Sequence, residues 1–278
     1  MMDQARGILY PARLPEFHRL PPPAAACALV RWFWVPQWSI APGRSSRQEV
    51  VGYPTVNVVV EPSGVIVVGA ATTRSHRDLR GRGWAVGALL RPAAVPAIAP
   101  RPAELVDGWA PVDAAELHAE ICAAMAGADP GERGRAAAVD AFARWLGEVV
   151  GTPTDRGLQA NTAAELLLDD REIVRVADAA DRLHVSARTL ERLMLDHVGV
   201  GPSAMIRRRR LQEAAQRVRD DPSADLAALA AELGYADHAH LTHDFRAVLG
   251  FTPSAYRGSA AGTADAGSGP SGDARSEA

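Results

Sequence analysis

The feature of this sequence that most constrains its fold is an internal repeat in the last third of its 278 residues. Residues 179–204 (AADRLHVSARTLERLMLDHVGVGPSA) align with residues 229–255 (LAAELGYADHAHLTHDFRAVLGFTPSA) after a one-residue insertion in the turn. Gly199 then aligns with Gly250, and each copy ends in the letters PSA. A repeat of this kind predicts that one supersecondary unit is built twice in the chain.

Each copy has the pattern of a helix-turn-helix unit. A short helix with small alanine side chains lets a second helix approach closely, and Ser186 or Asp237 is suited to cap that second helix. The second helix ends at a glycine, which is a common residue at helix C-termini. Its apolar stripe consists of Leu190, Met194 and Val198 in the first copy and of Leu241, Phe245 and Leu249 in the second. A helix with such a stripe and a polar outer face is the kind that enters a major groove of DNA.

The outer face of the second helix in the first copy carries the strongest candidates for reading DNA. Arg188 and Arg192 lie one helical turn apart, and either guanidinium can make a bidentate contact with guanine. Glu191 lies between them, where it can accept a hydrogen bond from a cytosine amine or orient the arginines. Phosphate contacts are expected from Ser186, Thr189 and Arg208.

Three histidines occur within six positions of the second copy, and such a group can also indicate a metal site. At about 100° per residue, His240 and His243 lie about 60° apart while His238 faces elsewhere. The three imidazoles therefore do not converge on one ion, and a surface site without cysteine is a poor structural zinc site. We expect no metal and no other cofactor. The alternative to a DNA contact is that these side chains are simply solvated.

The helical region resembles the DNA-binding domain of AraC/XylS-type transcription regulators. The resemblance is carried by ADAADRLHVSARTLERLMLDHVGVGPSAMIRRRRLQEA and LAALAAELGYADHAHLTHDFRAVLGFTPSAYR, and it covers residues 158–257. It implies an all-α domain whose two recognition helices enter successive major grooves of double-stranded DNA. It also places His238, Thr242 and His243 at positions that contact bases or backbone. His243 stands where the family commonly has arginine, which changes what this helix can read.

The N-terminal part of the chain has the pattern of a sheet. Short alternating runs predict strands at LVRWFWV (29–35), TVNVVVE (55–61), GVIVVGA (64–70) and WAVGALL (84–90). By analogy with regulators of this type, we expect residues 1–110 to form a cupin-like barrel that acts as a sensor domain. Its tryptophans, Trp32, Trp34 and Trp38, can line an apolar ligand pocket or fill the barrel core. The fold class is therefore α+β.

A helical dimerisation or linker region is expected between the two parts, at residues 111–151. Helices are predicted at 113–127 and 131–151, with a linker at 151–157. The second helix has a one-sided apolar stripe (Val139, Phe142, Leu146 and Val149), which can contact a second subunit or pack on its own barrel. The tail, residues 258–278, is rich in Gly, Ala and Ser, and we expect it to be disordered.

These patterns favour a sequence-specific DNA-binding transcription regulator over an enzyme. RNA polymerase, a small-molecule effector and a second copy of the chain are further candidate partners. The alternative is a cupin-type enzyme or a DNA-repair protein with a fused DNA-binding domain. The repair class needs a zinc-thiolate cluster or a reactive cysteine, but Cys27 and Cys122 lie far apart. No apolar run is long enough to span a membrane, so we expect no membrane partner. The two scattered cysteines give no disulfide framework, which favours a cytoplasmic location.

Overall fold

A computed structural model describes residues 16–50, 52–127 and 130–258. The predicted disordered tail lies outside these residues, apart from residue 258. The chain divides into two compact units at residues 1–212 and 213–278. No helix in the described ranges is long and apolar enough to cross a membrane.

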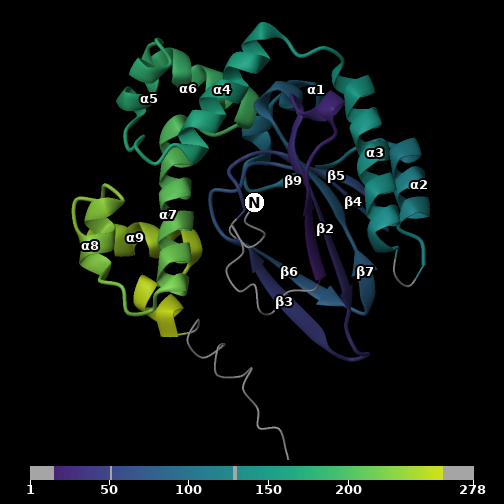
Figure 1. Ribbon diagram of the computed structural model, residues 1–278, viewed down its shortest axis with the longest axis horizontal. Coiled ribbons are helices and arrows are strands. Elements are labelled where there is room, and N and C mark those ends of the chain that lie inside the picture. The colour runs from purple at the N-terminus through teal and green to yellow at the C-terminus, as the bar shows by residue number, and fades with distance from the viewer. Residues whose placement is uncertain (1–15, 51, 128–129, 259–278) are drawn as a thin grey trace, which may run out of the picture. The chain divides into compact units, whose positions relative to one another are not determined.

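The first unit contains an antiparallel sheet with the strand order β1-β2-β8-β4-β5-β9, and β7 also pairs with β2 (Figure 1). Its strands are β1 (Glu16–Leu20), β2 (Val30–Ser39), β4 (Asn57–Glu61), β5 (Gly64–Val68), β7 (Arg82–Trp84), β8 (Val86–Leu90) and β9 (Trp109–Pro111). The four strands predicted from the sequence are confirmed as β2, β4, β5 and β8.

The expected barrel is not closed. Strands β3 (Ser45–Val50) and β6 (Ser75–Arg80) form a separate two-stranded ladder, and among the described strands each pairs only with the other. The main sheet therefore has free edges at β1 and β9 in the described part of the chain. The cupin-like prediction is correct in its strand content and wrong in its closure.

Strand β2 shows how the alternating sequence places side chains on two faces. Phe33 and Val35 point into the core and are fully buried. Trp34 and Trp38 lie on the opposite face, paired in register with Gly87 and Gly83. A Cβ atom at either glycine would collide with the indole across from it, so only glycine fits beneath the two rings.

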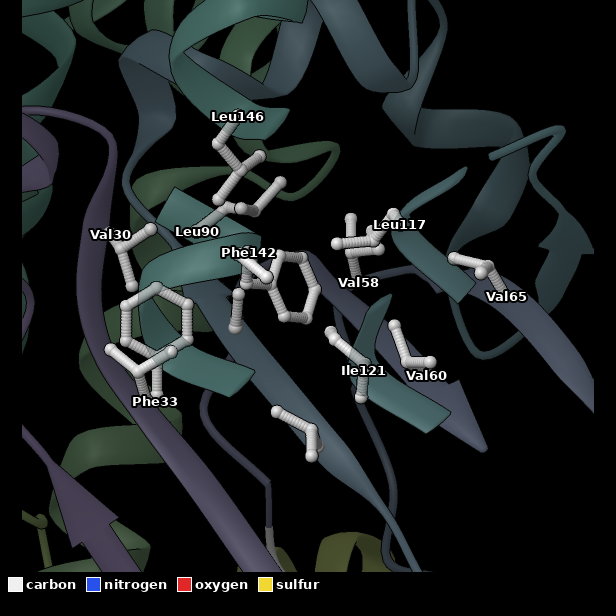
Figure 2. Packing of buried hydrophobic residues seen from close by; sticks show 14 of the residues in the cluster. Val30, Phe33, Val58, Val60, Val65, Leu90, Leu117, Ile121, Phe142 and Leu146 are labelled. Atoms are coloured by element: carbon white, nitrogen blue, oxygen red, sulfur yellow. The ribbon is translucent and has the colours of Figure 1, made fainter. Parts of the chain in front are cut away.

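Helices α2 (Ala115–Ala124) and α3 (Gly131–Val150) cover one face of this sheet. Phe142 and Leu146 of α3 are fully buried against sheet residues, and the Phe142 ring centroid lies 5.6 Å from that of Phe33 (Figure 2). Val139 belongs to the same core, whereas Val149 is 43% exposed. The apolar stripe of α3 therefore packs on its own sheet, and the alternative that it contacts a second subunit is wrong for these buried residues.

Short helices lie between strands of the sheet. Helix η2 (Ala24–Ala26) lies between β1 and β2, and η3 (Pro92–Ala94), α1 (Val95–Ile98) and η4 (Pro102–Leu105) lie between β8 and β9. Helix α4 (Asp155–Asp169) follows, and Thr154 caps it by accepting a hydrogen bond from the Gly157 amide. The predicted linker at 151–157 is thus shorter than expected, because its last three residues already belong to α4.

The repeat forms two helix-turn-helix motifs joined by one helix. The first consists of α5 (Val176–Arg182) and α6 (Ala187–Val198), and the second of α8 (Leu226–Glu232) and α9 (His238–Leu249). Helix α7 (Pro202–Asp220) connects them. The prediction of two such motifs is confirmed.

The first motif shares a core with the sheet. Trp32 and Leu89 of the sheet belong to the same buried cluster as Leu190 of α6 and Met205 of α7. This shared core explains why the first compact unit extends to residue 212, well beyond the expected domain boundary at 158.

Candidate nucleic-acid interface

The two candidate recognition helices, α6 and α9, begin and end in the same way. The Ser186 hydroxyl accepts a hydrogen bond from the Thr189 amide at 3.1 Å, and the Asp237 carboxylate accepts one from the His240 amide at 2.7 Å. At the other end, Gly199 and Gly250 take left-handed φ values of 91° and 80°. Both N-caps and both glycine C-caps are therefore as the sequence predicts.

The exposed face of α6 carries two unpaired arginines. Leu190, Met194 and Val198 are buried on the opposite face, which leaves Arg188 and Arg192 exposed. Neither guanidinium forms a hydrogen bond or ion pair within the part of the chain that the structure describes. A guanidinium held on a capped, packed helix with no internal partner is available to a ligand, and guanine and phosphate both match its donors.

Glu191 and Thr189, unlike the two arginines, have contacts with other residues of the protein. The carboxylate of Glu191 lies against Gly201, directly before the first residue of α7, where a helix N-terminus favours negative charge. The Thr189 hydroxyl lies 2.8 Å from that of Ser186 in the cap, and Thr189 is half-buried. Ser186 is exposed, so its hydroxyl can still reach a phosphate.

The three histidines of α9 lie in three different surroundings. The His238 Nε2 atom is 3.3 Å from the Thr242 hydroxyl, and the His240 ring packs edge-on against Tyr235 with 5.3 Å between centroids. His243 is exposed. Within the described ranges there is no group of three or more His, Cys, Asp or Glu side chains that could hold a metal ion. The outer face of α9 is therefore a mixed polar surface on which His238, Thr242 and His243 lie without converging.

Two further residues on these faces were missed by sequence reasoning. Arg246 is exposed on α9, three residues after His243 and four after Thr242, so the three side chains share one face. Leu195 is 39% exposed on α6, three residues after Arg192. An exposed leucine there can contact a thymine methyl group. The signal for both was their helical spacing from residues that had already been singled out.

Arg208 is not on the surface, where a residue must lie to contact a DNA phosphate. Its side chain is only 2% exposed. The guanidinium donates to three backbone carbonyls of the first unit, at Gly52 (3.1 Å), Thr72 (3.2 Å) and Thr73 (3.0 Å). Burial lowers the pKa of Arg208 to about 10. The predicted phosphate contact is wrong for this structure, because the donors of the guanidinium are used inside the protein.

Comparison with known proteins finds matches to two separate segments of the chain. Residues 179–259 match a family described as a helix-turn-helix domain, and residues 18–108 match a domain of unknown function, DUF6597. Over 82 residues the chain is 39% identical to a Streptomyces lividans protein described as an AraC-like transcription regulator. That match covers 30% of this chain and 27% of the relative, so the chain matches only about a quarter of the relative's length.

Solved structures of ToxT from Vibrio cholerae are distant neighbours. A 1.65 Å structure has a TM-score of 0.43 at 11% identity, over 81% of this chain and 97% of that one. ToxT bound to an unsaturated fatty acid has a TM-score of 0.39 at 10% identity, over 92% and 97% of the two chains. Scores at this level do not establish a shared fold.

Two capped helices, each the second helix of its motif and joined by one helix, form a double helix-turn-helix arrangement. This C-terminal segment is similar to the helix-turn-helix domain family and to part of the AraC-like regulator.

Proposed function

We propose that this protein is a sequence-specific DNA-binding transcription regulator that inserts α6 and α9 into successive major grooves of double-stranded DNA. The observation that carries the proposal is the unpaired, exposed pair Arg188 and Arg192 on a helix fixed by caps and a buried stripe. On α9, the proposed contacts come from His238, Thr242 and His243, with Arg246 added by the structure. Ser186 and Thr189 are proposed to contact phosphates near the start of α6.

The enzyme alternative has less support. A DNA-repair alkyl transferase needs a thiolate, but burial raises the pKa of Cys122, which keeps this thiol protonated near neutral pH. The Cys122 sulfur lies 3.5 Å from His118 Nε2. That imidazole is also within 3.0 Å of the Glu61 carbonyl oxygen, a contact in which the ring nitrogen can only donate. His118 is therefore poorly placed to act as the base that a reactive cysteine requires.

The first unit also offers a place for a small-molecule effector. It contains a cavity of about 920 Å³, within the range of about 300–1,000 Å³ that is usual for ligand pockets. Of the three predicted tryptophans only Trp38 lines this cavity, together with Trp84. We include a small-molecule effector, RNA polymerase and a second copy of the chain as proposed partners. The proposed place of action is the cytoplasm, where these partners meet.

The proposal is tested by selecting DNA sequences from a random pool with the full-length chain. We expect enrichment of a site that contains guanine where α6 docks. Arg188→Gln should lose about 1–3 kcal/mol on the enriched site and much less on unrelated DNA. Arg133→Gln removes an exposed arginine from α3 and serves as the matched control, with unchanged binding. No enrichment by the wild-type chain would overturn the proposal.

A further inference from the structure

Among the described residues, Leu195 is the one large apolar side chain that is exposed on the two proposed recognition helices. It is 39% exposed, whereas the other exposed large apolar side chains of the described chain lie outside α6 and α9. It takes no part in the buried face of α6, which consists of Leu190, Leu193, Met194, His197 and Val198. Because single exposed leucines are common on protein surfaces, exposure alone indicates no function. The informative observation is the position of Leu195 relative to the charged groups of α6.

Leu195 lies in one row with the two unpaired arginines of α6. At about 100° per residue, with Leu190 at 0°, Leu195 lies near 140°, Arg188 near 160° and Arg192 near 200°. The three side chains are therefore within about 60° of one another, on the side away from the buried stripe. Arg188 and Leu195 are seven residues apart in the sequence. At 1.5 Å per residue they lie about 10 Å apart along the helix axis.

The two carboxylates beside this row have contacts inside the protein. Asp196 accepts a hydrogen bond from the Arg156 guanidinium of α4 at 3.0 Å. Glu191 lies with its carboxylate against Gly201, directly before α7. The outer face of α6 therefore combines two guanidinium groups with one apolar group, and its neighbouring acids do not remain unpartnered beside DNA phosphates.

This combination of groups matches a particular pair of bases in a major groove. Guanine presents two acceptors that an arginine fork can bind, and thymine is the standard DNA base that presents a methyl group there. A leucine side chain can contact that methyl group. It can accept no hydrogen bond, so the exocyclic amine of cytosine or adenine would lose water beneath it without gaining a partner. Thymine is therefore the base that suits Leu195.

We infer that α6 reads a guanine and a thymine in one half-site and that Leu195 is the residue that specifies the thymine. Stacked bases are about 3.4 Å apart along the duplex, so a separation of about 10 Å places the thymine roughly three base pairs from the guanine bound by Arg188. This inference rests on the proposed DNA-binding function and adds to it a second base and a spacing.

The spacing is tested by selecting DNA from a random pool with the full-length wild-type chain and with Leu195→Ala in parallel. We expect the wild type to enrich a thymine at this spacing from an enriched guanine. Leu195→Ala should still enrich the guanine but should accept any base at the thymine position. A wild-type site that contains the guanine without this thymine would overturn the inference and leave the proposed function standing. The absence of any enriched site would overturn the proposed function, and the inference with it.

The methyl contact is tested by replacing that single thymine with deoxyuridine in the selected duplex, because the change removes the methyl group and keeps the base pair. We expect the affinity of the wild-type chain to fall about fourfold, as for the loss of one methyl-sized apolar contact. Leu195→Ala should bind the two duplexes with equal affinity. Equal affinity of the wild type for both duplexes would contradict the assignment, as would a preference for thymine that Leu195→Ala retains.

Leu158→Ala is the matched control, because it makes the same truncation at a leucine that is 42% exposed on α4. It should keep the wild-type preference for the thymine duplex over the deoxyuridine duplex. Leu195→Met retains an apolar side chain and should keep most of that preference. All three variants should melt close to wild type, because each change is at an exposed helical position and alanine and methionine favour helices. Loss of the preference in Leu158→Ala as well would refute a specific role for Leu195.

Discussion

Replacing Phe142 by alanine distinguishes a core role of α3 from a role between subunits. The ring is fully buried, with its centroid 5.6 Å from that of Phe33 (Figure 2). Its centroid lies 6.0 Å from that of Trp145. Truncating a buried phenylalanine costs about 3–5 kcal/mol, and the loss of two aromatic contacts favours the upper half of that range. For a unit of this size, about 4 kcal/mol corresponds to a fall of roughly 8–16 °C in melting temperature.

The assay is thermal unfolding followed by near-ultraviolet circular dichroism, with sedimentation velocity on the same samples. Val149→Ala is the matched control, because Val149 lies on the same helix but is 43% exposed. That control should stay within about 0.5 kcal/mol of wild type. A Phe142→Ala chain that melts like wild type but sediments as a smaller species would refute the core assignment and restore the subunit contact.

Three further outcomes are expected. Burial holds the pKa of His197 below its usual value of 6.5. As the pH falls below 6.5, this side chain is therefore protonated in the unfolded chain before it is protonated in the folded chain. Stability should therefore drop between pH 7.5 and 5.5, and His197→Gln should show a smaller drop in melting temperature over that interval. Asp237→Ala should cost about 1 kcal/mol through loss of the α9 cap, measured by denaturant unfolding, and an unchanged midpoint would contradict the cap. Chelation and dialysis should leave DNA binding unaltered, whereas a loss restored only by zinc would reverse the interpretation of the histidines.

The parts of the fold that could be predicted from sequence are those with a local signal. The caps at Ser186 and Asp237 and the glycines at Gly199 and Gly250 are short-range patterns, and all four are found as expected. Strand β3, with the sequence SSRQEV, was missed because it lacks the apolar alternation that marks a half-buried strand.

The rest depends on contacts between distant residues. The apolar stripe on α3 has the same sequence pattern whether it packs on a sheet or on a second subunit. Only the fold shows that Phe33 lies against Phe142. The sequence predicts a phosphate contact for Arg208 because this residue stands in a run of arginines on a polar helix face. Nothing local shows that carbonyls about 135 to 156 positions earlier in the chain would accept its hydrogen bonds.

The central claim is that both recognition helices read DNA, and changing their spacing on the DNA tests it most directly. Helix α7 has 19 residues and is therefore about 28 Å long at 1.5 Å per residue, which is compatible with docking of α6 and α9 about one turn of B-DNA apart. The full-length chain is used, because the first motif shares its core with the sheet. Inserting five base pairs between the two half-sites of a selected sequence places them on opposite faces of the duplex. We predict that affinity then falls towards the value for unrelated DNA, whereas full affinity after the insertion would mean that only one motif reads DNA and would contradict the claim.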